Sequence, residues 1–202
     1  MGYNGIDFAE CPVNLIDGWI KRGNDEPDIL FKFVAYWIAF NQMYNLEDVN
    51  ETMSERKAIE QFCIKQCDTI IDALDFGADY MKIFKERPIL RWLDTTGRYD
   101  WREGKEFVAD MIMERLSFRK DRPYFEKNCK EAAAYYVNIC NPRCRNSDKA
   151  IALMMSIYRV RSNLFHGIKD PDTKRNYDLI KSSAEILENC LPALRAAMYG
   201  NW

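Results

Sequence analysis

The sequence predicts a single all-α domain over residues 1–202, a helical bundle of about seven or eight helices. Apolar residues recur at spacings of three and four in several long stretches, which is the spacing that forms one face of an α-helix. No stretch of several residues alternates apolar and polar side chains with the period of two expected of a half-buried strand. Hydrophobic residues make up 48% of 202 residues, which is enough for a substantial core. No repeat, low-complexity run or linker divides the chain.

The N-terminal part carries start signals for two helices. Residues 26–28, Glu-Pro-Asp, precede a strongly apolar stretch from Ile29 to Tyr44, and this combination is typical of a helix start. Residues 52–55, Thr-Met-Ser-Glu, have the spacing of a capping box, with Ser54 as an alternative cap. One amphipathic helix, which Gly77 is expected to end, is predicted by the apolar spacing that follows: Ile59, Phe62, Cys63, Cys67, Ile70, Ile71 and Leu74.

The middle of the chain is less regular. Short helical patterns and turn-forming residues alternate over about 78–120, and we expect this region to be an insertion into a simpler bundle. A further helix is predicted from Pro123 to about Cys140, because Asn-Pro at residues 141–142 breaks the chain.

Two helices are predicted in the C-terminal part. Ser-Asp at residues 147–148 is the expected N-cap of the first, and Gly167 its expected end. Asp-Thr at residues 172–173 supplies the cap of the last helix, which Pro192 is expected to kink or end. The first carries the apolar residues Ile151, Met154, Met155, Tyr158 and Phe165. The last has an apolar face of Tyr177, Ile180, Ala184, Leu187 and Leu191.

Charge and composition narrow the classes of function. The net charge is −2 and the isoelectric point about 5.6, so no overall positive field attracts nucleic acid, and RNA contact would need a local patch. The first eight residues lack the features of a signal peptide, and the longest apolar run, residues 33–40, is far shorter than a membrane span. The odd cysteine count of 7 fits free thiols in a reducing compartment. We therefore expect a cytoplasmic protein without membrane association.

The strongest pattern for chemistry is the run Tyr-Arg-Val-Arg-Ser-Asn-Leu-Phe-His-Gly at residues 158–167, which contains the one histidine of the chain. Such a helix can present a phosphodiester receptor, because arginine pairs with phosphate through two hydrogen bonds and histidine titrates near neutral pH. The structural alternative is a histidine that caps the helix C-terminus beside solvated arginines. On an ideal helix, the polar residues before His166 lie about 20°, 40°, 60° and 140° from it: Arg159, Ser162, Asn163 and Arg161, respectively.

This run resembles the motif of the HEPN superfamily, in which an arginine is followed after four to six residues by a histidine in the penultimate long helix. Arg161 matches the four-residue spacing and Arg159 the six-residue spacing. The family usually has Asn, Asp or His after the arginine, whereas this chain has Ser162 and then Asn163. The aromatic stretch at residues 31–44 also resembles the early helix of HEPN-like proteins whose motif reads Arg-Asn-Asn-Leu-Phe-His-Gly.

The resemblance implies a homodimeric endoribonuclease that needs neither metal nor cofactor, in a family whose members often act as toxins or defence effectors. HEPN ribonucleases place two Arg-His helices across one cleft and leave a 2′,3′-cyclic phosphate. The reaction needs a base for the 2′-hydroxyl and an acid for the leaving 5′-oxygen, and a two-fold dimer supplies His166 twice. The implied partners are RNA, a second copy of the chain, and a neutralising antitoxin or associated defence protein.

The expected roles divide between two catalytic residues and several supporting ones. His166 is expected to transfer protons and Arg161 to stabilise charge on the phosphorus. For Asn41, the structural alternative is a buried amide that the backbone satisfies. The residues expected to support the charge or to orient the histidine or phosphate are Arg159, Ser162, Asn163 and Asn41.

Other interpretations stay open. The departure at Ser162 and the acidic isoelectric point favour a non-catalytic HEPN dimerisation or RNA-binding module, and a purely structural helical protein is a third interpretation. No metal site is expected, because the pairs Cys63/Cys67 and Cys140/Cys144 do not have the usual zinc spacing, and core packing explains the first pair. Six basic residues flank the motif and are solvated surface unless they face His166: Arg143, Arg145, Lys149, Lys169, Lys174 and Arg175.

Overall fold

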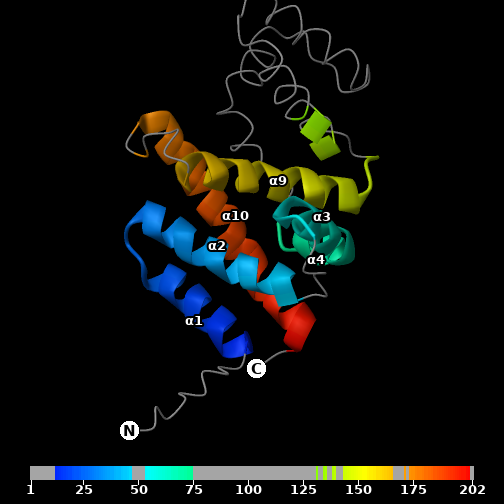
Figure 1. Ribbon diagram of the computed structural model, residues 1–202, viewed down its shortest axis with the longest axis horizontal. Coiled ribbons are helices and arrows are strands. Elements are labelled where there is room, and N and C mark those ends of the chain that lie inside the picture. The colour runs from blue at the N-terminus through cyan, green and yellow to red at the C-terminus, as the bar shows by residue number, and fades with distance from the viewer. Residues whose placement is uncertain are drawn as a thin grey trace, which may run out of the picture.

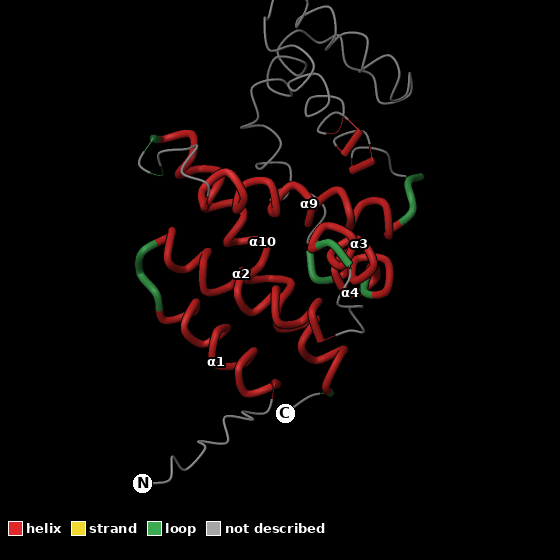
Figure 2. Tube along the Cα trace, viewed as in Figure 1, coloured by secondary structure: helices red, strands yellow, loops and turns green. Residues whose placement is uncertain are grey.

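A computed structural model of the protein describes residues 12–46, 53–74, 131, 134–135, 138–139, 143–165, 171 and 173–200. These residues form helices joined by turns and contain no strand, so the predicted all-α class is confirmed for the described part of the chain (Figure 2). The described helices are α1 (Pro12–Asp25), α2 (Ile29–Leu46), α3 (Glu55–Lys65), α4 (Cys67–Asp72), α9 (Asn146–Phe165) and α10 (Lys174–Tyr199).

Several predicted features lie wholly or partly outside the described residues. The predicted insertion at 78–120, the helix end at Gly77 and the break at 141–142 are outside them. Within the helix predicted from Pro123 to Cys140, the described residues at 131, 134–135 and 138–139 are helical. The total of seven or eight helices therefore stays a prediction.

Helix α2 is the centre of the described core. It contacts α1, α3 and α10, and Figure 1 shows α1 beside it and α10 crossing it. A helix that is apolar on all sides is stable only when neighbours cover all of them. Its start is the predicted one, because Asp28 Oδ1 accepts hydrogen bonds from the backbone N–H groups of Leu30 (2.9 Å) and Phe31 (3.1 Å). Its buried residues are Phe33, Ala35, Tyr36, Trp37, Ala39, Phe40, Met43 and Tyr44.

The single amphipathic helix predicted after residue 52 is in fact two helices, α3 and α4. They meet at Gln66, whose φ of −104° and ψ of 18° leave the helical region and interrupt the helix. Both pieces pack against α9. Ser54 occupies the N-cap position of α3, but its side chain makes no capping hydrogen bond, and Thr52 lies outside the described residues. Glu55 is therefore the first residue of α3, where its carboxylate is available for tertiary contacts.

The two long C-terminal helices agree with the prediction at some of their ends and differ from it at others. Helix α9 begins at Asn146, so residues 147–148 lie in its first turn, and Asp148 accepts hydrogen bonds from the Arg145 side chain at 3.0 and 3.2 Å. The N-cap of α10 is Thr173, within the predicted pair. Pro192 lies inside α10, so the prediction that it could end this helix is wrong.

Two predicted core residues are exposed instead. Phe165, at the end of α9, is 55% exposed, and Tyr177, in the first turn of α10, is 45% exposed. Both lie near a helix end, where helical periodicity continues but neighbouring helices no longer cover the side chain. Among the described helices, none combines the length and the apolar character that crossing a membrane requires.

Candidate functional site

Arg161, on the last turn of α9, is held by side chains from three helices. Its Nη1 donates a hydrogen bond to Glu55 Oε2 of α3 at 3.4 Å. Its Cζ lies 5.7 Å from the ring centroid of Trp37 in α2 and 5.0 Å from that of Phe165 in α9. Both distances are within the range of cation–π attraction. The guanidinium therefore has a defined place while its side chain stays 27% exposed.

Two buried donors lie on these side chains, Arg161 Nε and Trp37 Nε1. Neither has a hydrogen-bond partner among the residues that the structure describes. A buried donor that lacks an acceptor costs about 1–3 kcal/mol, so most native donors of this kind are paired. Among the described residues, Glu55 is the hydrogen-bond acceptor that reaches the Arg161 guanidinium, and the part of this side chain that is exposed can meet a further acceptor.

A chain of polar side chains leads from α2 to the carboxylate of Glu55. Tyr44 donates its hydroxyl to Glu55 Oε1 at 2.9 Å, and Asn41 Nδ2 donates to the Tyr44 oxygen. Asn45 Nδ2 donates in turn to Asn41 Oδ1 at 2.9 Å. Asn41 is thus satisfied by side chains and not by the backbone, and it reaches Arg161 only through Tyr44 and Glu55.

The hydroxyl of Tyr44 is a fixed donor in this chain. The ring is 1% exposed, and burial, followed by the nearby Glu55 charge, raises the pKa of Tyr44 well above its usual value. The phenol therefore stays protonated at physiological pH. Because its one proton goes to Glu55, its oxygen accepts the Asn41 amide, and the direction of the whole chain is set.

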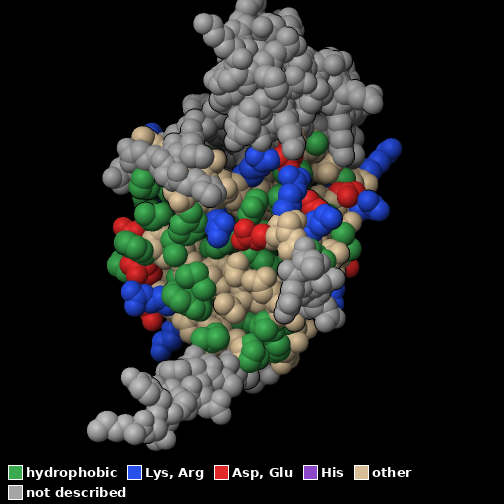
Figure 3. All heavy atoms as spheres, viewed as in Figure 1, with side chains coloured by type: hydrophobic (Ala, Val, Ile, Leu, Met, Phe, Trp, Pro, Cys, Tyr) green, Lys and Arg blue, Asp and Glu red, His purple; other side chains and the backbone are tan. Residues whose placement is uncertain are grey.

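Arg159 contacts a different carboxylate. Its Nη2 pairs with Glu131 Oε2, and the same carboxylate accepts Arg56 Nη2 at 2.5 Å and the Tyr135 hydroxyl at 2.7 Å. On an ideal helix, residues two apart point about 200° apart, which explains why Arg159 and Arg161 have separate partners. The adjacent residues Glu55 and Arg56 connect the two ion-pair groups at the start of α3. Figure 3 shows the result as basic and acidic side chains mixed over α9 and α3.

The remaining predicted site residues are placed only in part. Ser162 and Asn163 are half-buried on the same last turn of α9 as Arg161. His166 and Gly167 lie outside the described residues, so the role of the histidine and the predicted helix end stay predictions.

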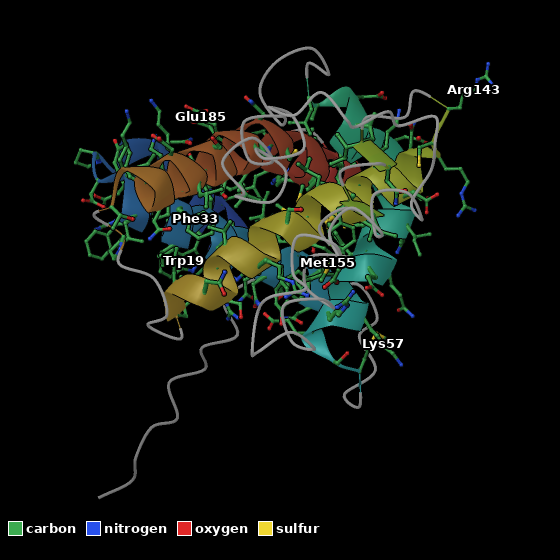
Figure 4. The ribbon with its side chains drawn as sticks, turned by 90° about the horizontal axis from the view of Figure 1, so that it is seen from above. Trp19, Phe33, Lys57, Arg143, Met155 and Glu185 are labelled. Atoms are coloured by element: carbon green, nitrogen blue, oxygen red, sulfur yellow. The ribbon has the colours of Figure 1, made fainter. Side chains whose placement is uncertain are left out.

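The basic residues before the motif lie toward the opposite end of α9 from Arg161. Arg143 and Arg145 lie at the start of α9, and Figure 4 shows Arg143 pointing away from the helices. With a rise of about 1.5 Å per residue, Arg145 is roughly 24 Å along the helix from Arg161. Of the basic residues after the motif, Lys174 is exposed, whereas Lys169 and the side chain of Arg175 lie outside the described residues.

The cysteines contribute to packing. Cys63 is fully buried in the core and Cys67 packs against it, so core packing is confirmed for this pair. Cys144 Sγ lies 3.9 Å from Asp148 Oδ2, and Cys140 is outside the described residues. Among the residues described, no group of three His, Cys, Asp or Glu side chains is arranged to hold a metal ion.

Four residues that surround Arg161 or its carboxylate partner were not assigned to the site from the sequence: Tyr44, Glu55, Trp37 and Phe165. Local signals pointed elsewhere, because Glu55 fits a capping box and the three aromatic residues fit helix cores. Glu55 and Arg161 are 106 residues apart, so only the packing of α3 on α9 brings them together. The described arrangement can bind an anion through a partly exposed guanidinium between two rings.

In comparisons with known proteins, no family model, no curated protein and no solved structure matches this chain.

Proposed function

We propose that this protein is a metal-independent endoribonuclease in which Arg161 binds the scissile phosphate and His166 transfers protons. The proposal combines the HEPN-like run at residues 158–167 with the surroundings of Arg161. It includes a homodimer, which supplies two copies of His166, and a role as a toxin or defence effector that an antitoxin or associated protein restrains.

The observation that carries the proposal is the incomplete pairing of Arg161. Three helices fix its guanidinium, yet Nε has no acceptor and Glu55 occupies one edge alone. The side chain is 27% exposed, and a phosphate suits the planar guanidinium because it offers several acceptor oxygens, so it can pair with the exposed part of the group. On an ideal helix His166 lies about 140° from Arg161, so the proposal brings the two groups to one phosphate through the long arginine side chain, a frayed helix end or the partner chain.

The chemistry assigns one task to each group. A base removes the proton of the 2′-hydroxyl, the 2′-oxygen attacks phosphorus, and the bond from phosphorus to the 5′-oxygen breaks as an acid protonates that oxygen. The products are a 2′,3′-cyclic phosphate and a 5′-hydroxyl end. Arg161 stabilises the extra negative charge on the phosphate oxygens in the transition state. Arg159 is bound by Glu131, which favours Arg161 over Arg159 for this task.

A second candidate is a non-catalytic RNA-binding or dimerisation module. The ion pairs of Arg161 with Glu55 and of Arg159 with Glu131 favour it, because both motif arginines already have carboxylate partners. The departure at Ser162 points the same way.

A cleavage assay separates the two candidates. Wild type, Arg161→Ala and His166→Ala are incubated with single-stranded RNA in excess chelator, and the new 3′ ends are analysed for cyclic phosphate. The ribonuclease proposal expects cyclic phosphate ends from wild type and losses of about 10²-fold or more in both variants. RNA binding without cleavage by wild type would instead support the second candidate, and cleavage by His166→Ala at the wild-type rate would refute the assignment of the histidine.

A further inference from the structure

The carboxylate of Glu55 accepts hydrogen bonds from side chains of two other helices. Tyr44 reaches Oε1 and Arg161 reaches Oε2, so the two oxygens of one carboxylate connect α2 to α9. A glutamate side chain has several rotatable bonds, and a second hydrogen bond restricts its rotamers. The buried hydroxyl of Tyr44 thus restricts Glu55, which in turn restricts Arg161.

We propose that Tyr44 and Glu55 are positioning residues for Arg161, fixing where its guanidinium lies and lowering the positive charge it presents until a phosphodiester competes for it. This inference rests on the proposed ribonuclease function, since Arg161 is the residue assigned there to the phosphate. Neither Tyr44 nor Glu55 needs to touch RNA in this role.

The geometry of the Glu55 contact fits positioning better than stabilisation of the fold. The Nη1–Oε2 distance is 3.4 Å, and the side chains of Arg161 and Glu55 are 27% and 33% exposed. Ion pairs with this exposure are screened by water and add little to stability. A contact of this kind can be exchanged for a phosphate oxygen at small cost, while the Tyr44 hydrogen bond keeps Glu55 in place.

The chain contains a matched control for Tyr44. Tyr36 lies on the same helix, is fully buried, and donates its hydroxyl to Asn24 Oδ1 at 2.8 Å, on the side of α1. Tyr36→Phe and Tyr44→Phe therefore remove the same atom from two buried rings of α2. Only the second removal acts on Glu55 and Arg161.

Three measurements on the full chain test the inference. The first is kcat and KM for single-stranded RNA. The second is affinity for a short 2′-O-methyl oligouridine, which lacks the attacking hydroxyl, at low and high salt. The third is the NMR signal of the Arg161 Nε–H group, identified by its loss in Arg161→Lys.

We expect Tyr44→Phe to lower kcat about tenfold with little change in KM, as for the loss of one hydrogen bond to a charged group. Tyr36→Phe is expected to leave both constants unchanged. Glu55→Gln removes the competing charge, so oligouridine binding should tighten a few-fold at low salt and less at high salt. The Nε–H signal should move in Tyr44→Phe and Glu55→Gln and stay in place in Tyr36→Phe.

Equal effects of Tyr44→Phe and Tyr36→Phe on kcat, or an Nε–H signal that neither Tyr44→Phe nor Glu55→Gln moves, would overturn the inference. If wild type cleaves no RNA, the proposed function fails, and the NMR signal alone then decides. A shift confined to Tyr44→Phe and Glu55→Gln would still support positioning of Arg161, and its absence would refute it.

Discussion

Arg195 and Arg161 each bind a carboxylate from another helix, and their surroundings differ. Arg195 of α10 donates Nε and Nη2 to the two oxygens of Asp17 in α1, at 3.0 and 3.2 Å, and Nη1 to the Gly200 carbonyl at 2.6 Å. Arg161 of α9 makes one contact with Glu55 at 3.4 Å and leaves its buried Nε without an acceptor. Their side chains are 10% and 27% exposed, respectively.

The two arginines thus differ in how completely carboxylate and carbonyl acceptors pair their guanidinium groups. The two hydrogen bonds from Arg195 to Asp17 join α10 to α1. Its Nε, Nη1 and Nη2 atoms each donate to an acceptor. Arg161 is kept in place by two rings and one carboxylate, and among the described residues Glu55 is the one hydrogen-bond acceptor of its guanidinium.

The largest stability effect is expected for Arg195. Arg195→Ala leaves Asp17 as a nearly buried, unpaired charge, and we expect the free energy of unfolding to fall by about 3–5 kcal/mol. Urea unfolding followed by circular dichroism measures it. Arg161→Ala is the matched variant and should cost about 1 kcal/mol. Similar losses in the two variants would remove the distinction between the two arginines.

A smaller loss is expected for Gly23→Ala, which tests how tightly α1 packs on α2. A Cβ atom at Gly23 would lie 2.3 Å from Tyr36 Cε1, and the hydrogen bond to Asn24 keeps this buried ring from moving. We expect a cost of about 1–3 kcal/mol from overpacking. Gly18→Ala, in the same helix with no atom within 4 Å, is the control and should stabilise by about 0.5–1 kcal/mol. If Gly23→Ala proved as stabilising as Gly18→Ala, α1 would be able to shift away from α2, and the tight packing would be refuted.

The smallest effect at neutral pH concerns Cys190 of α10, whose Sγ lies 3.9 Å from the Ile70 carbonyl oxygen of α4. Burial raises the pKa of Cys190 from 9.0 to about 12. Above pH 9 the unfolded chain loses this proton before the folded chain does, so the stability contributed by the neutral thiol is lost as the pH rises from 9 toward 12. Unfolding free energies between pH 7 and 10.5 should therefore fall more steeply in wild type than in Cys190→Ala. Identical slopes would contradict a protonated buried thiol.

Local signals in the sequence predicted the helices better than the contacts between them. The start of α2 follows from Asp28, whose carboxylate caps the helix, and from an apolar run that must be covered on all sides. The break at Gln66 was missed, because the apolar spacing continues through it while the backbone does not. The exposure of Phe165 was missed for a related reason, since periodicity does not show where neighbouring helices end.

The sequence indicated candidate residues and not the contacts around them. The motif offered Arg161 and Arg159 for one cationic role, but no local signal could pair them with Glu55 and Glu131. Those pairs depend on how α3 and residue 131 pack beside α9. The amide of Asn41 was noticed on an apolar helix, although its link to the site runs through Tyr44, which had no polar signal of its own.

Cleavage of single-stranded RNA by Arg161→Lys, measured beside its free energy of unfolding, tests the central claim most directly. Lysine keeps the charge and much of the stem but loses the planar set of donors that a phosphate would use. We expect the cleavage rate to fall by about 10²-fold and the free energy of unfolding to change by less than about 1 kcal/mol. A variant that cleaves RNA at the wild-type rate, or that loses activity only because it unfolds, would contradict the account.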